Sequence, residues 1–163
     1  MTAQYSDTEI VDIARQIERC GEAFYEQALP HLKDPKVREV FAWLRDEERK
    51  HAATFERLLA GVELAAGQWR HAEEYLGYLH ALVDSRVFPD PADAAAAVAQ
   101  LSDDAAAIRY AIGFEKDSIL FFHELGRMVG EADRALVEQL IAEERRHLCT
   151  LDALLRDPGA GAA

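Results

Sequence analysis

The sequence predicts an all-α protein: a four-helix bundle made of two antiparallel helical hairpins that are joined by a long, partly helical crossover. Apolar residues recur at helical spacing through long stretches, and no stretch alternates in the manner of a β-strand. The five prolines lie at only three places in the chain, which leaves these stretches free to form helices. We expect a single domain over residues 1–157, followed by a flexible tail over 158–163.

The first hairpin is expected over about residues 7–60. Its first helix begins with a capping box, in which the Ser6 side chain accepts from the backbone of Glu9 and the Glu9 side chain reaches back. Pro30 marks the end of this helix. Asp34 is a typical N-cap residue and is followed by a proline, which is favoured in the first turn, so the second helix begins here.

The second hairpin is expected over about residues 104–156, after a crossover over about 61–103. A short helix is expected within the crossover, from about 71 to 87, and a turn that contains two prolines follows it. The third long helix starts near residue 92, with an interruption expected at 102–104, where a serine and two aspartates follow one another. One long crossover between two hairpins is a connectivity that four-helix bundles use.

The composition narrows the possible functions. The formal net charge of −12 repels phosphate backbones, so we expect no binding to nucleic acid. No run approaches the ~20 apolar residues of a membrane span, and the N-terminus lacks the basic and apolar segments of a signal peptide. We therefore expect a cytoplasmic protein that does not contact membranes.

The two cysteines, Cys20 and Cys149, lie far apart and form no C-x-x-C motif. This excludes zinc and iron sites that need four sulfurs. We interpret both as buried, reduced thiols, because free cysteine is usually a core residue.

The two predicted hairpins repeat one another. In their first helices an alanine, a glutamate and an aromatic pair recur at an offset of 97, the difference between positions 18 and 115, and in their second helices the offset is 96. The matched residues are Ala14, Glu18, Phe24, Tyr25, Leu44, Glu47, Glu48, Arg49, His51, Leu58 and Leu59 with Ala111, Glu115, Phe121, Phe122, Leu140, Glu143, Glu144, Arg145, His147, Leu154 and Leu155. Amphipathic helices alone would repeat the apolar positions but not the Glu and His positions. The repeat therefore indicates a pseudo-symmetric bundle.

The second helix of each hairpin carries a Glu-x-x-His pair. Because residues three apart share a helix face, Glu48 with His51 and Glu144 with His147 each present a carboxylate and an imidazole together. Apolar residues on the same face direct each pair inward. A single Glu-x-x-His pair is common on solvated helices, but two copies in register have few such explanations.

Glu18 and Glu115 lie among apolar residues of the other two helices, so four carboxylates are expected to converge in the core. Burying even one unpaired carboxylate is strongly disfavoured, and no matching set of Lys and Arg faces inward. Two divalent metal ions resolve this conflict. One glutamate from each of two helices and a Glu-x-x-His pair from each of the others form the ligand set of carboxylate-bridged two-metal bundles.

At these positions the sequence resembles the rubrerythrin branch of the ferritin-like di-iron carboxylate superfamily. The resemblance covers about residues 10–60 and 105–156 and rests on the Glu-x6-Tyr of the first helix and on both Glu-x-x-His motifs. It implies a ferritin-like fold and two iron ions, which manganese or zinc could replace. It assigns Glu18, Glu48 and His51 to one ion and Glu115, Glu144 and His147 to the other, with Glu48 and Glu144 as bridges. Tyr25 would donate a hydrogen bond to a ligand carboxylate and orient it.

Three departures from the family pattern bear on activity. The C-terminal rubredoxin domain of full-length rubrerythrins is absent from this sequence, so we expect an external electron donor such as a rubredoxin-type protein. Peroxide-reducing members carry a second glutamate three residues after the ligand of the third helix, where this chain has Ser118. A serine cannot replace that carboxylate in the ligand switch of those members. Phe122 stands where the repeat would place a second tyrosine.

The leading hypothesis for function is a homodimeric redox protein that reacts with hydrogen peroxide or dioxygen, as in rubrerythrin-like protection against oxidative stress. The alternative is a protein that binds, stores or delivers iron without turnover. A helical interaction module without metal is the third hypothesis.

Several polar and aromatic residues lie outside the predicted ligand set. Glu47 and Glu143 precede ligands and are expected to face solvent or to pair with Lys50, with Arg146 or with each other's helices. His123 lies one residue past an inward position and could approach the edge of the site. The other residues considered are His31, His71 and His80, expected on the surface, and Trp43 and Trp69, interpreted as interface anchors or core residues.

Overall fold

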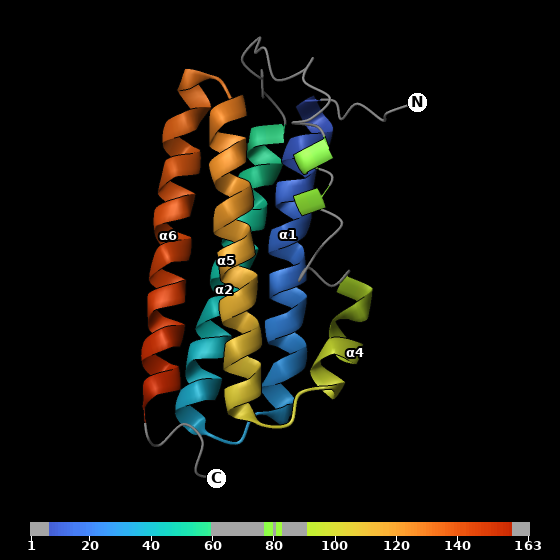
Figure 1. Ribbon diagram of the computed structural model, residues 1–163, viewed down its shortest axis with the longest axis vertical. Helices are drawn as coiled ribbons and strands as arrows, with labels where there is room; N and C mark the ends of the chain where they lie inside the picture. Colours follow the sequence, from blue (N-terminus) through green and yellow to red (C-terminus); the bar gives the residue numbers. More distant parts are fainter. Residues whose placement is uncertain (1–6, 60–76, 80, 83–90, 158–163) are drawn as a thin grey trace.

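Four long helices lie side by side in the computed structural model, which describes residues 7–59, 77–79, 81–82 and 91–157 (Figure 1). These helices are α1 (Asp7–Ala28), α2 (Pro35–Leu59), α5 (Asp104–Met128) and α6 (Glu131–Arg156). The described residues contain no β-strand. The all-α, ferritin-like four-helix bundle expected from the sequence is confirmed.

The four helices form two hairpins. α1 packs mainly against α2 and α5 mainly against α6, and the hairpins meet through α1 with α5 and α2 with α6. A further short helix, α4 (Ala94–Ala99), packs on the outer side of α1, as Figure 1 shows. The 3-10 turn η3 (Pro91–Asp93) leads into α4. This part of the connection between the hairpins is helical, as expected.

The turn within the first hairpin follows its sequence signals. α1 ends at Ala28 and continues as the 3-10 turn η1 (Leu29–His31), which contains the proline expected to end the helix. Asp34 Oδ1 accepts a hydrogen bond from the backbone N–H of Lys36 at 2.8 Å, and α2 begins at Pro35. A capping aspartate and a proline in the first turn therefore start α2.

The expected interruption before the third long helix is also confirmed. α4 ends at Ala99, and the backbone of Asp103 is extended before α5 begins. Asp103 Oδ1 accepts a hydrogen bond from the backbone N–H of Ala106 at 2.7 Å, which caps the first turn of α5.

The next residue, Asp104, joins the two hairpins at one end of the bundle. Its side chain is buried, and Oδ2 accepts hydrogen bonds from the backbone N–H groups of Asp34 at 2.8 Å and Lys33 at 3.1 Å. A carboxylate at the start of α5 therefore binds the turn between α1 and α2. This contact was not expected from the sequence.

Two apolar clusters fill the bundle, one toward each end. One is centred on Phe55, Phe114 and Phe122, with residues from the first half of α1 and the second half of α2. The other is centred on Phe24, Tyr25 and Phe41, with residues from the start of α5 and the end of α6. The buried glutamates and histidines occupy the layer between the two clusters.

Cys149 corrects an expectation. Cys20 is buried, but Cys149 is exposed on α6, and both are free thiols. Cys149 lies midway between the buried residues His147 and Leu151. A residue two positions from each of them points to the opposite side of the helix, so Cys149 faces outward.

Several expectations fall on residues outside the described part. They are the capping serine Ser6, most of the expected 71–87 helix, His71, His80, Trp69 and the tail. Residues 77–79 and 81–82 of the expected helix are described and are helical. None of the described helices is long and apolar enough to span a bilayer.

Candidate metal centre

Six predicted ligands lie in the polar layer between the two apolar clusters. Each of the four long helices contributes, through Glu18 on α1, Glu48 and His51 on α2, Glu115 on α5, and Glu144 and His147 on α6. All six are at most 2% exposed. The i, i+3 spacing on α2 and α6 directs each carboxylate and its histidine to the same interior space.

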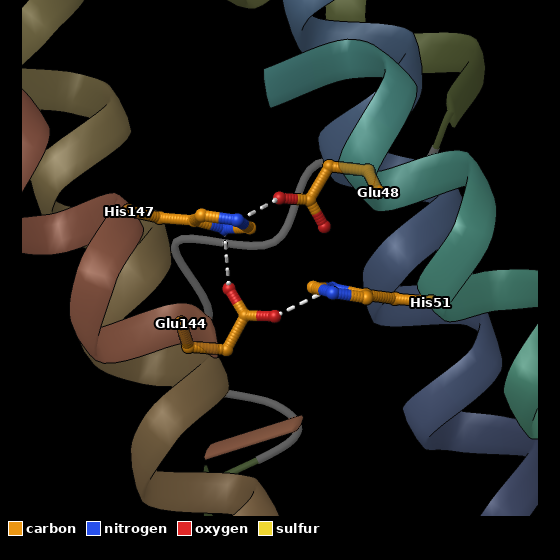
Figure 2. Close-up of side chains that lie close together, drawn as sticks. All are labelled: Glu48, His51, Glu144 and His147. Atoms are coloured by element: carbon orange, nitrogen blue, oxygen red, sulfur yellow. Dashed lines mark hydrogen bonds and ion pairs between the residues drawn. The ribbon is translucent and has the colours of Figure 1, made fainter. Parts of the chain in front are cut away.

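Glu144 lies between the two histidines, as Figure 2 shows. Its Oε1 is 2.7 Å from Nδ1 of His51, and its Oε2 is 3.1 Å from Nδ1 of His147. Glu48 Oε1 lies 3.7 Å from the same His147 nitrogen. The two imidazole rings are stacked, with centroids 5.4 Å apart. One potential ligand atom from each of these four residues falls within 4.8 Å of the others.

The remaining two glutamates each approach one histidine. Glu18 Oε2 lies 3.1 Å from His51 Nδ1, and Glu115 Oε2 lies 3.7 Å from His147 Nδ1. Each histidine therefore has a glutamate beside it that the other histidine lacks. This is the grouping that the family resemblance implies for two metal positions; the roles of the six residues as ligands stay a prediction.

The hydrogen bonding of the carboxylate oxygens shows whether the residues of this site fit metal ions. Glu18 Oε1, Glu48 Oε1, Glu115 Oε2 and Glu144 Oε1 are all buried and make no well-oriented hydrogen bond within the described part of the chain, although the last three lie 2.7–3.7 Å from a histidine nitrogen. A buried acceptor without a donor is costly, and four beside one another are more so. Four carboxylates and two imidazoles are a donor set for two divalent cations, so the residues fit the expected centre.

The sequence matches a known protein family over most of its length. The model of the family described as Rubrerythrin matches residues 9–155. This chain belongs to the rubrerythrin family. No protein with a curated description matches the sequence.

The fold of this family member has a counterpart among solved structures. A crystal structure from Thermotoga maritima, of a protein assigned as ferritin-like and diiron-carboxylate, superimposes with a TM-score of 0.69. The match covers 96% of this chain and 99% of that one, at 24% sequence identity. At this identity the likeness establishes the shared ferritin-like fold.

Burial and mutual repulsion disturb the protonation of three glutamates in this rubrerythrin-family site. Burial, with the charge of Glu144, raises the pKa of Glu18 well above its ordinary value. Burial and the neighbouring carboxylates likewise raise the pKa of Glu48, and that of Glu115 to about 8. Without metal, the Glu115 carboxyl group therefore keeps its proton near neutral pH.

For Glu144 and the two histidines, the neighbouring opposite charges outweigh the effect of burial on the pKa. Burial alone would raise the pKa of Glu144, but its contacts with His147 and His51 hold it well below the ordinary value. Burial alone would lower the pKa values of the histidines, but adjacent carboxylates raise them to about 9 for His51 and about 10 for His147. In the metal-free protein the two imidazolium groups thus supply part of the positive charge that metal ions would otherwise supply.

Tyr25 lies beside the cluster, and the repeat breaks at its partner position. The Tyr25 hydroxyl donates a hydrogen bond to Glu115 Oε1 at 2.5 Å. Phe122 has no hydroxyl and packs against Phe55, with ring centroids 5.1 Å apart. Only one half of the site therefore has a phenol beside its carboxylates, as the sequence comparison indicated.

Ser118 occupies the place where peroxide-reducing relatives carry a further glutamate. It is buried one turn from Glu115, and its hydroxyl donates to the backbone carbonyl of Phe114 at 3.1 Å. The hydroxyl is thus engaged within its own helix. This position supplies no carboxylate to the centre.

The sequence interpretation of Glu143 was incomplete. Glu143 lies 3.5 Å from Arg146, as expected, but its Oε2 also accepts a hydrogen bond from His51 Nε2 at 2.8 Å. Glu47 pairs with Lys50 as expected, at 2.5 Å. No sequence signal distinguishes Glu143 from the other acidic residues of α6, because the contact depends on how α6 packs against α2.

Of the other aromatic and histidine side chains considered, Trp43 borders the site, whereas His123 and His31 do not. Trp43 is 40% exposed, and its ring meets the His147 ring edge-on with centroids 5.1 Å apart. Trp43 therefore lies against a predicted ligand, between the surface and the centre. His123 is exposed and contacts Arg145, and His31 is exposed, so neither joins the buried cluster.

Proposed function

We propose that this rubrerythrin-family protein is a di-iron redox protein that reacts with hydrogen peroxide or dioxygen and receives electrons from an external donor. The observation that carries the proposal is the set of four buried glutamates, each with an oxygen that makes no hydrogen bond within the described residues, around two histidines. Iron bound there would supply one-electron redox chemistry. Oxygen-rich ligands favour the ferric state, which suits a centre that reacts with oxidants.

The ligand roles follow the contacts. Glu18 and His51 would hold one ion, and Glu115 and His147 the other. Glu144, whose two oxygens face the two histidines, would be shared, together with Glu48. Manganese or zinc would accept the same donors, and we propose iron because of the family.

The other residues of the chain would prepare the centre. Tyr25 orients Glu115 through its hydrogen bond and keeps its proton, because burial raises the pKa of this phenol well above its usual value. The two apolar clusters exclude bulk water from both ends of the polar layer. A surface hollow of about 530 Å³, lined in part by Trp43 and His147, offers small oxidants a short approach.

The test is anaerobic loading with ferrous iron, followed by rapid mixing with hydrogen peroxide or with air. We expect near-ultraviolet absorption to develop with both oxidants and much faster with peroxide. His123→Ala, at an exposed histidine outside the cluster, should behave like the wild type, and His147→Ala should not develop the signal. Equal sluggishness with both oxidants would contradict the peroxidase form of the proposal.

A second function, iron binding for storage or delivery, is favoured by one observation. Ser118 leaves the centre without the extra carboxylate of peroxide-reducing relatives. Size-exclusion mass separates the two functions, because a homodimer fits the redox protein and a large cage fits a store. We propose the homodimer, a rubredoxin-type donor and a cytoplasmic location as the setting of the redox function.

A further inference from the structure

We propose that Glu143 makes the two metal positions unequal, so that the position at His51 binds its ion first and more tightly than the position at His147. The inference rests on the proposed metal centre. It concerns Nε2 of each histidine, the ring nitrogen that points away from the cluster. Glu143 would be a positioning residue that acts through His51, without touching a metal ion itself.

His51 is held from both sides. Its Nδ1 faces the cluster, 2.7 Å from Glu144 and 3.1 Å from Glu18, and its Nε2 donates to Glu143 at 2.8 Å. The His51 side chain is only 3% exposed and that of Glu143 is 20% exposed, so the hydrogen bond lies at the edge of the buried layer. An Nε2–H fixed on a carboxylate leaves the Nδ1 lone pair available for a metal ion in one fixed ring orientation.

His147 differs at the corresponding atom. Its Nδ1 also faces the cluster, 3.1 Å from Glu144, but no group of the described residues accepts a hydrogen bond from its Nε2. Its ring instead meets Trp43 edge-on and borders the surface hollow. The two imidazoles are therefore alike toward the cluster and unlike away from it.

The internal repeat identifies the contact that is missing on the other side. Glu143 of α6 corresponds to Glu47 of α2, and the symmetric contact would join Glu47 to His147. Glu47 pairs with Lys50 at 2.5 Å instead, and its carboxylate lies near Glu143 and His51, with ligand atoms of all three within 4.8 Å of one another. Both acidic side chains thus gather behind His51.

The hydrogen bond from His51 to Glu143 should raise the metal affinity of the His51 position by an amount that can be estimated. A carboxylate that accepts from the outer N–H of a ligating histidine fixes the tautomer and raises the basicity of the ligand, and its removal typically lowers metal affinity about 10–100-fold. The His51 position has this support and the His147 position does not. We infer an affinity difference of the same order between the two positions.

The experiment is an anaerobic titration of the metal-free full chain with Co²⁺, followed by the visible absorption of the bound ion. The wild type should bind two ions in two resolved steps. His51→Ala should remove the tight step, and His147→Ala the weak one. Glu143→Ala should weaken the tight step about 10–100-fold, leave the weak step within about twofold, and shift the absorption of the first ion.

Two further variants separate the effect of the Glu143–His51 hydrogen bond from the effect of negative charge near His51. Glu47→Ala removes a negative charge from the same neighbourhood without breaking a bond to His51, and both steps should stay unchanged. Glu143→Gln keeps an acceptor for His51 Nε2 but loses the charge, so it should recover part of the tight step. Far-ultraviolet circular dichroism of each variant checks that the bundle is intact.

The outcomes distinguish this inference from the proposed function. Two equal steps in the wild type, or a Glu143→Ala variant that weakens both steps alike, would overturn the inference and leave the metal centre standing. An equal loss in Glu47→Ala would also overturn it, because charge alone would then explain the effect. A wild-type protein that binds no Co²⁺ would overturn the metal centre itself.

Discussion

The hydroxyl of Tyr25, on α1 of one hairpin, donates a hydrogen bond to Glu115, on α5 of the other, with 2.5 Å between the oxygens. Both side chains are fully buried. The bond therefore joins the two halves of the molecule inside the polar layer, and it supports a carboxylate that has an unpartnered oxygen as well.

Replacing Tyr25 with Phe should lower the free energy of unfolding of the metal-free protein by about 1–3 kcal/mol, because the buried Glu115 oxygen loses its donor. Urea denaturation would measure the loss. In the Glu115→Gln background the same replacement should cost a different amount, and a double-mutant cycle would give the coupling between the two residues. A coupling energy near zero would contradict the importance of the bond.

Glu48→Gln should change stability in opposite directions with and without metal. In the metal-free protein the variant removes a buried, repelling carboxyl group, so its melting temperature should rise. With ferrous iron or zinc, the rise in melting temperature seen for the wild type should shrink, because a ligand is missing. Glu39→Gln, at an exposed position of α2, is the control and should change neither value. Lower stability of the metal-free variant would argue against repulsion in the cluster.

The metal-free protein should lose stability as the pH rises from about 6 to about 9. Glu115 has a pKa of about 8, and His51 and His147 have values of about 9 and 10, each above the ordinary value of its residue type. The folded state therefore binds more protons than the unfolded state in this window, and a rise in pH favours unfolding.

The metal-loaded protein should be nearly insensitive to the same change, since its ligands are already deprotonated. Urea midpoints at several pH values, with and without zinc, would measure both trends. Metal binding at neutral pH should also release protons, which a pH indicator in weak buffer would detect. A metal-free protein that becomes more stable toward pH 9 would refute the assigned direction.

Gly21 allows α1 to approach the centre closely. A Cβ atom at this position would lie 2.6 Å from Cε1 of Phe114 and 3.2 Å from the carboxyl carbon of Glu48. Gly21→Ala should therefore destabilise the protein by about 1–3 kcal/mol through overpacking, although alanine is the better helix former. It should also weaken metal binding, because Glu48 must shift.

Gly126→Ala is the matched control on α5. The added Cβ would lie 3.4 Å from Val137, an ordinary contact, so the gain in helix propensity should stabilise the protein by up to about 1 kcal/mol. Thermal denaturation and a metal titration of both variants would test the pair. Equal effects of the two substitutions would remove the argument for close packing at Gly21.

The four helices and the polar layer could be predicted from the sequence. The helices depend on local residue spacing, and the polar layer shows as charged residues at helix positions that are otherwise apolar. Asp34 caps α2 as its sequence context predicted, and Asp103 lies in the expected interruption and caps α5. Glutamates in apolar helix faces stand out, since such positions otherwise hold leucine or phenylalanine. The internal repeat then selected the glutamates and histidines that meet.

Other features depend on distances between helices and were not predictable from spacing. Asp104 was expected only to interrupt a helix, and its bond to the α1–α2 turn exists because the start of α5 lies beside that turn at one end of the bundle. Glu143 shares the charge of many exposed residues, so only the packing of α6 on α2 shows its contact with His51. For Cys149 the general preference of cysteine for the core was outweighed by its place on the outer face of α6.

The polar layer divides the apolar interior into two smaller parts, so a newly made chain without metal has an interior that is interrupted at its middle. Such a chain should open more often and be a better substrate for proteases than the loaded one. We therefore expect the lifetime of this protein to follow the supply of metal. Its abundance would then report how much of its metal is available, before any oxidant has arrived.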